Sequence, residues 1–343
     1  MRKDENMVSY HVPKPFLDFD NLKMPKEVKI YDRTLRGIVQ TTGKSIPGEL
    51  KADLTKKLSL LGVDVIEVGI PFLSDEEYEG FKAASSSDIK TKLSALARTN
   101  KEDIKKAYEV GADRVYTFMA TSEFHIKNII KSTHEEIMSR SVSSIKYIKE
   151  LGMECEFTIR DAMNSDFDFL AKFIENIEKA GIDVINIADT VAITTPRSVY
   201  SFISRIKKLT DIPISVHFHD DFGMATANAL AAVEAGAEQI HCAVLGWSER
   251  AGMPPTEEIG VALKQLYKIG TSLNLEIVSE IADFLSEKYN IPIPPNKAIV
   301  GHNAFLYEVG PYFHSNDGPK IIQFEPYPPE LVGRDRAEKP KGF

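Results

Sequence analysis

The amino-acid sequence predicts an α/β fold, a TIM (β/α)8 barrel followed by a small C-terminal subdomain. From about Val28 onward, apolar runs of strand length alternate with segments of helical periodicity. There are eight such runs, and eight strand–helix units with parallel strands are expected to close into a barrel. A weak internal repeat marks every second unit and supports the count.

The expected strands are five or six residues long, and each is followed by a helix. The strands are predicted at Val28–Asp32, Val65–Gly69, Lys92–Ala97, Arg114–Phe118, Glu154–Ile159, Val184–Ala188, Ile214–His219 and Glu238–Ala243. The clearest helical patterns between them are Pro47–Leu61, Glu135–Leu151, Ser165–Ala180 and Pro196–Leu209.

The repeat begins with a glycine, has an acidic residue two positions later and then enters a strand. Its four copies start at Gly62, Gly111, Gly181 and Gly236. Glycine at this point is typical of the left-handed C-terminal cap of a helix.

Alternation along the four strands of the repeat assigns their faces. The side chains expected to face the helices are those of Ile66, Val115, Ile185 and Ile240. The side chains expected inside the barrel are those of Glu67, Tyr116, Asn186 and His241.

Three segments are expected along the chain. Residues 1–26 are an N-terminal extension, residues 27–270 form the barrel, and residues 271–343 form a helical and loop subdomain. The barrel closes with a helix at Thr256–Ile269, and the subdomain opens with one at Asn274–Tyr289. We expect the subdomain to pack on another surface, and we expect a homodimer formed through it.

Composition argues for a cytoplasmic protein that acts on small molecules. The net charge is −8 and the sequence has no long basic run, which argues against nucleic acid or an anionic membrane as partner. The first residues carry no apolar signal segment, and no apolar run approaches the ~18 residues that cross a bilayer. Cys155 and Cys242 lie in apolar strands, as expected of free, buried thiols.

The sharpest local signal is His217-Phe218-His219 at the end of the seventh strand. Histidines at i and i+2 share a strand face, and active sites of such barrels lie at the carboxyl ends of the strands. Neutral imidazoles there are good ligands for a divalent metal. Asp220 and Asp221 follow, and they would either orient the imidazoles or cap the next helix.

Other polar residues fall at the same end of the barrel. Arg36, after the first strand, is a candidate clamp for a carboxylate or an oxyanion, and a salt bridge inside the barrel is the alternative. On the fifth strand, Glu156, Thr158 and Arg160 share one face. His125 and Thr190 follow the fourth and sixth strands and are placed at the rim.

Together these segments resemble the metal-dependent barrel family of 2-isopropylmalate, homocitrate, citramalate and Re-citrate synthases and HMG-CoA lyase. Asp32–Gln40 is similar to the family's Asp-x-Thr-Leu-Arg-Asp-Gly-x-Gln, and Val216–Gly223 to its His-x-His-Asn-Asp-x-Gly. Gly246–Gly252 is similar to Gly-x-Gly-Glu-Arg-x-Gly. Asn303–Phe305 and Pro329–Arg334 resemble the subdomain that follows the synthase barrel, which favours a synthase over a lyase.

The resemblance implies a Claisen-type condensation of an acyl-CoA, usually acetyl-CoA, with a 2-oxo acid. Mn, Mg or Zn held by His217 and His219 would polarise the keto group of the 2-oxo acid. The residues predicted to act in catalysis are Arg36, Glu156 and His314. Those predicted to bind substrate are Gln40, Glu67, His125, Thr158, Arg160 and Thr190.

The sequence departs from the family pattern at several positions. Gly37 stands where the family has its acidic metal ligand, so Glu67 or a substrate carboxylate would have to complete the metal site. Arg160 stands where the family has a glutamate. Other departures are Met253, Tyr307 and Phe324, while His314 is a candidate for a shifted subdomain histidine.

Two other functions are compatible with the sequence. One is a lyase or aldolase that runs the retro-Claisen reaction on the same scaffold. The other is a non-catalytic barrel that binds a metabolite or regulates a partner synthase. Because no leucine-sensing domain follows the subdomain in this sequence, we expect homocitrate-, Re-citrate- or citramalate-type substrates at least as readily as those of the leucine pathway.

Overall fold

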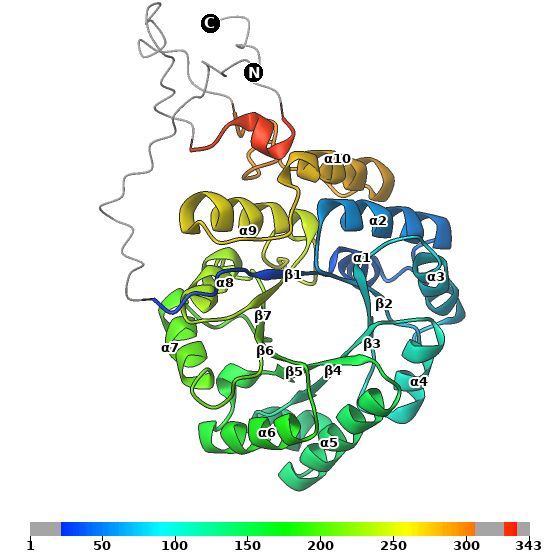
Figure 1. Ribbon diagram of the computed structural model, residues 1–343, viewed down its shortest axis with the longest axis vertical. Coiled ribbons are helices and arrows are strands. Elements are labelled where there is room, and N and C mark those ends of the chain that lie inside the picture. The colour runs from blue at the N-terminus through cyan, green and yellow to red at the C-terminus, as the bar shows by residue number, and fades with distance from the viewer. Residues whose placement is uncertain (1–21, 306–325, 335–343) are drawn as a thin grey trace, which may run out of the picture.

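A computed structural model describes residues 22–305 and 326–334, and its centre is a closed barrel of eight parallel strands in sequence order (Figure 1). Each predicted strand is present, with ends that differ from the prediction by two residues at most. The strands are β1 (Lys29–Asp32), β2 (Val65–Gly69), β3 (Lys92–Leu96), β4 (Arg114–Ala120), β5 (Glu154–Arg160), β6 (Val184–Asp189), β7 (Ile214–Phe218) and β8 (Gln239–Cys242).

The helices form a ring outside the strands, and the last of them lies beyond that ring (Figure 1). They are α1 (Thr34–Thr42), α2 (Gly48–Leu61), α3 (Asp75–Ser85), α4 (Lys101–Glu109), α5 (His134–Glu150), α6 (Phe167–Lys179), α7 (Pro196–Ile206), α8 (Ala225–Glu234), α9 (Thr256–Ala262) and α10 (Val278–Tyr289). Helix α1 was not singled out in the sequence. It begins directly after β1, so Arg36 lies on a helical turn at the barrel mouth rather than on extended chain.

The repeat performs two tasks in the fold. Its glycines adopt the expected left-handed conformation, with φ of 85° at Gly62, 80° at Gly111, 91° at Gly181 and 101° at Gly236. Its acidic side chains each accept a hydrogen bond from a backbone N–H of the preceding odd-numbered strand. The pairs are Asp64 with Ile30, Asp113 with Leu93, Asp183 with Cys155 and Glu238 with Ile214, at 2.7–2.8 Å. The repeat therefore ends a helix and satisfies an otherwise unpaired strand amide.

The predicted strand faces are confirmed. Ile66, Val115, Ile185 and Ile240 belong to the large apolar core that the strands share with the helices. Tyr116 meets His241 across the lumen, with ring centroids 5.6 Å apart, and Asn186 donates to Ser215. Polar side chains thus fill the barrel interior.

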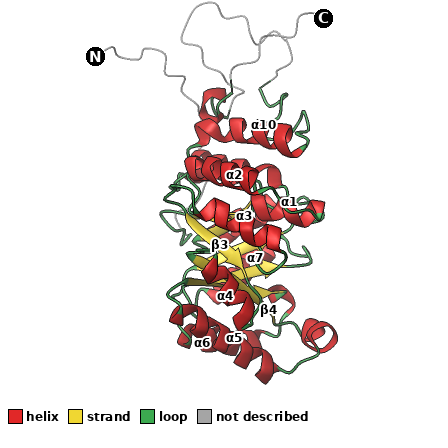
Figure 2. Cartoon of the chain, turned by 90° about the vertical axis from the view of Figure 1, so that its right-hand side faces the viewer, coloured by secondary structure: helices red, strands yellow, loops and turns green. Residues whose placement is uncertain are grey.

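Residues after the barrel pack on its outside. Helix α10 covers α2 (Figures 1 and 2), where Tyr289 donates a hydrogen bond to the carbonyl of Leu50 and Lys57 lies 4.8 Å from the Phe284 ring. In the described part of the chain, this first helix of the expected subdomain therefore covers the barrel of its own chain. His314, Tyr307 and Phe324 lie outside the described residues.

Two expectations from composition can be compared with the structure. Cys155 and Cys242 are buried and free, as predicted. Across residues 22–305 and 326–334, no helix has both the length and the apolar character needed to span a membrane.

Candidate active site at the barrel mouth

Arg33 links several strands at the mouth of the barrel. It follows β1 directly, and its backbone N–H donates to the carbonyl of Cys242 on β8. Its Nε donates to Glu67 Oε2 on β2 at 2.6 Å, while its Nη1 lies 3.1 Å and 3.2 Å from the two ring nitrogens of His217 on β7. Arg33 therefore bridges three strands just inside the mouth.

Sequence reasoning did not single out Arg33, although a signal was present. Tyr31 points into the lumen, where its ring stacks on that of His241 at 4.0 Å. By strand alternation the side chain two residues later points the same way. The clue was an arginine at that position, four residues before Gly37, which stands where the family has an acidic residue.

Arg36 and Glu67 complete a buried group of charges with Arg33. Arg36 Nε lies 4.0 Å from Glu67 Oε1, and Glu67 is completely buried. Arg36 Nε and Nη1 and Glu67 Oε1 have no hydrogen-bond partner among the described residues. Two guanidinium groups thus share one carboxylate, which leaves the mouth with excess positive charge and unused donors.

His217 and His219 lie together, as the strand alternation predicts. Their Nε2 atoms are 3.3 Å apart, and Nδ1 of His219 has no partner among the described residues. Burial is the main cause that lowers the pKa of both rings, to about 4 for His219, and nearby arginines lower both further. Both imidazoles are therefore neutral near pH 7.

The two aspartates after the histidines have other tasks. Asp220 accepts from the backbone N–H of Ala225 at the start of α8, so the capping alternative describes it. Asp221 forms an ion pair with Arg250 at 2.8 Å. No hydrogen bond joins either carboxylate to the imidazoles within the described residues.

Glu156 lies deep in the barrel, away from the mouth where its predicted catalytic role would place it. It accepts from His241 Nε2 at 2.6 Å, from Arg114 at 2.9 Å and from Gln239 at 2.9 Å. Arg114 and Gln239 are the first residues of β4 and β8, so this network lies toward the amino ends of the strands, opposite the mouth. Despite its burial, its cationic and hydrogen-bonding neighbours lower the pKa of Glu156 to about 2, which suits a structural counter-charge. Its catalytic role stays a prediction.

The rim brings two of the predicted substrate-binding residues together. His125 Nδ1 lies 2.9 Å from Asp161 Oδ2 and 2.9 Å from the Ser122 hydroxyl, which leaves Nε2 available. The backbone N–H of Asp161 donates to the Thr190 hydroxyl at 2.9 Å. His125 and Thr190 are therefore linked through Asp161.

The other predicted substrate-binding residues are dispersed. Thr158 is buried and donates to Asn186. Arg160 ends β5, is exposed, and lies over the ring of Phe118 at 5.2 Å. Gln40 is half-buried on α1. Their substrate-binding roles stay predictions.

Gly37 is held against the loop that follows β8. A Cβ atom added at Gly37 would lie 2.2 Å from the carbonyl oxygen of Trp247 and 3.4 Å from Cα of Ser248. The indole of Trp247 donates to the Thr41 hydroxyl, which fixes this loop on α1. The backbone of the loop thus fills the space that any side chain at residue 37 would need.

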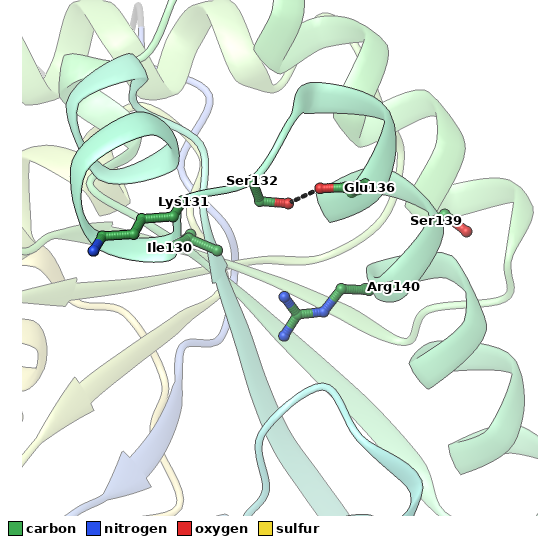
Figure 3. A pocket seen from close by; sticks show the side chains of 6 residues that line it. All are labelled: Ile130, Lys131, Ser132, Glu136, Ser139 and Arg140. Carbon is green, nitrogen blue, oxygen red and sulfur yellow. Dashed lines mark hydrogen bonds between the residues drawn. The ribbon is translucent and has the colours of Figure 1, made fainter.

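A surface hollow of about 440 Å³ lies apart from these residues (Figure 3). It lies between the end of the short helical segment His125–Ile130 and helix α5, and Arg140 points into it. It shares no lining residue with the charged group at the mouth, so we assign it no part in the chemistry.

The chain belongs to the HMGL-like family, whose model matches residues 27–285. It is 44% identical over 317 residues to a 2-isopropylmalate synthase of Methanocaldococcus jannaschii, covering 92% of this chain and 61% of that protein. It is 39% identical over 316 residues to homocitrate synthase AksA of Methanopyrus kandleri, covering 92% of this chain and 79% of that protein. The chain therefore spans about three-fifths of the first of these relatives.

Solved structures confirm the fold. Hydroxymethylglutaryl-CoA lyase from Pseudomonas aeruginosa superposes with a TM-score of 0.71 at 20% identity, covering 81% of this chain and 97% of that one. At this level of identity the likeness concerns the barrel alone.

Enzymes of this family generally depend on a divalent metal, and the mouth of this barrel does not fit one. Within the described ranges, no group of three or more histidine, cysteine, aspartate or glutamate side chains could hold a metal ion. A metal ~2.1 Å from His217 Nε2 would lie within about 5 Å of Arg33 Nη1. At an effective dielectric constant of ~20, charges of +2 and +1 at that distance repel by about 7 kcal/mol. Glu67, one of the two candidates for the third ligand, already compensates two arginines.

Proposed function

We propose that this protein is a condensing synthase that joins an acyl-CoA, acetyl-CoA in the first instance, to a 2-oxo acid. The support is the family membership and the two synthase relatives, each matched over 92% of this chain. The product would be a 2-hydroxy dicarboxylic or tricarboxylic acid, and free CoA would be released.

The observation that carries the proposal is the pair of arginines at the mouth. Buried donors without a partner are costly, so the free Nε and Nη1 of Arg36 call for acceptor oxygens. A 2-oxo acid offers a carboxylate and an adjacent keto oxygen in one plane, which matches the planar donor array of a guanidinium. Arg33 supplies a second permanent cation beside it.

In the proposed reaction the acyl-CoA loses an α-proton to a base, and the enolate carbon bonds to the keto carbon of the 2-oxo acid. The keto oxygen takes up a proton as it becomes a hydroxyl. Water then cleaves the thioester to a carboxylic acid and the CoA thiol, which makes the reaction irreversible. Arg36 would stabilise the negative charge that develops on oxygen, as donors at such sites do.

The rim residues have a positioning role in this scheme. Asp161 holds Nδ1 of His125, so Nε2 faces outward as a hydrogen-bond partner for substrate. Thr190 is fixed by the Asp161 amide. The homodimer through residues 271–343 and the cytoplasmic location remain predictions, whereas Arg33 beside His217 argues against the predicted assignment of His217 and His219 to Mn, Mg or Zn.

The test is release of free CoA, followed with a thiol reagent. Acetyl-CoA is paired in turn with pyruvate, 2-oxoisovalerate, oxaloacetate and 2-oxoglutarate, each with chelator or with added Mn, Mg or Zn. We expect release that depends on one 2-oxo acid and falls by about a hundredfold or more in Arg36→Met. Arg197→Met, on the exposed face of α7, is the matched control. Absence of release with every pair would refute the proposal.

A further inference from the structure

The cation at this barrel mouth is part of the chain. Arg33 Nε is 2.6 Å from Glu67 and its Nη1 is 3.1 Å from the nearer ring nitrogen of His217, so the guanidinium lies against His217, whose Nε2 is in turn 3.3 Å from Nε2 of His219. The charge of Glu67 is the largest influence that raises the pKa of Arg33, against the opposing effect of burial. The guanidinium is thus a permanent positive charge.

The pair Gly37 and Arg33 carries the same net charge as a carboxylate at residue 37 with a divalent metal would. A carboxylate at residue 37 together with a divalent cation would contribute a net charge of +1 to the site. Glycine together with a guanidinium contributes the same +1. The formal net charge of the mouth is therefore the same in the two arrangements, with a guanidinium that donates hydrogen bonds in place of the metal and its ligand.

The surrounding backbone leaves no room for an acidic side chain at residue 37. The Trp247 carbonyl is 2.2 Å from the position of a Cβ on Gly37, and the loop is anchored by the indole hydrogen bond to Thr41. This packing is independent of Arg33, so two separate features of the structure disfavour the three-ligand site.

We propose that Arg33 takes the place of the divalent metal, so that the 2-oxo acid is bound and its keto group polarised by the Arg33 and Arg36 guanidiniums. This inference rests on the proposed function for the identity of the ligand. As the attacking carbon bonds to the keto carbon, the electron pair moves onto the keto oxygen. The hydrogen bonds from the guanidiniums then strengthen, because they become charge-assisted on both sides. His217 lies against Arg33, and His219 lies against His217.

The test measures metal content and ligand binding separately from turnover. Full-length protein is analysed for metals after incubation with Mn and Zn and desalting. Binding of pyruvate, 2-oxoisovalerate, oxaloacetate and 2-oxoglutarate is followed by fluorescence of Trp247, the single tryptophan of the chain, which lies against α1. We expect well under one equivalent of metal and binding that is unchanged by chelator.

Variants distinguish the role of Arg33 from a purely structural one. Arg33→Met should weaken 2-oxo acid binding by about tenfold or more, Arg33→Lys by less, and Arg197→Met not at all. One equivalent of metal whose removal abolishes binding would overturn the inference, and so would a failure of all four acids to bind. Chelator-insensitive, Arg33-dependent binding without CoA release would refute the proposed function and leave the inference standing.

Discussion

Glu67 offers the most direct test of the charge arrangement at the mouth. It is fully buried and is the only described carboxylate that forms an ion pair with Arg33 and Arg36. Glu67→Gln keeps the shape of the side chain and removes its charge. Two guanidiniums then remain buried without a counter-charge.

The expected cost follows from the geometry. Arg33 Nε is 2.6 Å and Arg36 Nε 4.0 Å from the carboxylate oxygens. At an effective dielectric constant of ~20, unit charges 4 Å apart attract by about 4 kcal/mol. Removing one partner of a buried ion pair typically costs 3–5 kcal/mol, roughly the loss we expect in the free energy of unfolding.

The assay is equilibrium unfolding in urea followed by circular dichroism. Glu109→Gln is the matched control, because its partner Lys105 is 3.4 Å away on an exposed turn of α4. Exposed pairs of this kind contribute about 0.5 kcal/mol or less. If Glu67→Gln costs no more than Glu109→Gln, the account of a buried, shared counter-charge is wrong.

Three further predictions concern packing, pH and the repeat. Gly37→Ala should lower the free energy of unfolding by about 1–3 kcal/mol and shift the fluorescence of Trp247, because the new methyl group displaces the backbone carbonyl of Trp247. An unchanged spectrum and unchanged stability would contradict this. The pKa of Glu156 in the folded protein lies below its ordinary value of ~4.3. Its ionised form therefore contributes about 3 kcal/mol to the free energy of unfolding above pH ~4.3, and this contribution is lost as the pH falls toward 2. Acid unfolding of Glu156→Gln should therefore depend less steeply on pH than that of the wild type over this range, and equal slopes would refute the assignment. Asp183→Ala should cost about 1–3 kcal/mol in urea unfolding, since it leaves the Cys155 amide without its acceptor; a loss within experimental error would contradict the role of the repeat.

The barrel could be predicted from the sequence because its signals are local and repeated. Gly62 and its three counterparts mark helix ends by a backbone requirement that belongs to the residue itself. The acidic residue two positions later was visible as a pattern. Its partner, an amide on the preceding odd-numbered strand, was not, because the four contacts span 20 to 34 residues, the longest from Asp64 to Ile30.

The position of the two histidines at the barrel mouth was predicted from the sequence, but the charges around them were not anticipated. His217 and His219 could be placed at the mouth from strand alternation alone. The role of Arg33 depends on three strands, since its partners Glu67 and His217 lie 34 and 184 residues away. The packing of Gly37 against Trp247 likewise joins the segment after the first strand to the loop after the last strand. No local pattern reports such contacts.

The proposed condensation is tested most directly by following the new carbon–carbon bond. Acetyl-CoA labelled with ¹³C at the methyl carbon is incubated with the 2-oxo acid that supports CoA release, in the presence of chelator, and the products are identified by NMR. The account predicts that the label appears in a methylene group next to a tertiary carbinol carbon, with one CoA released per bond formed. Label recovered only as acetate would show plain thioester hydrolysis and would contradict the account.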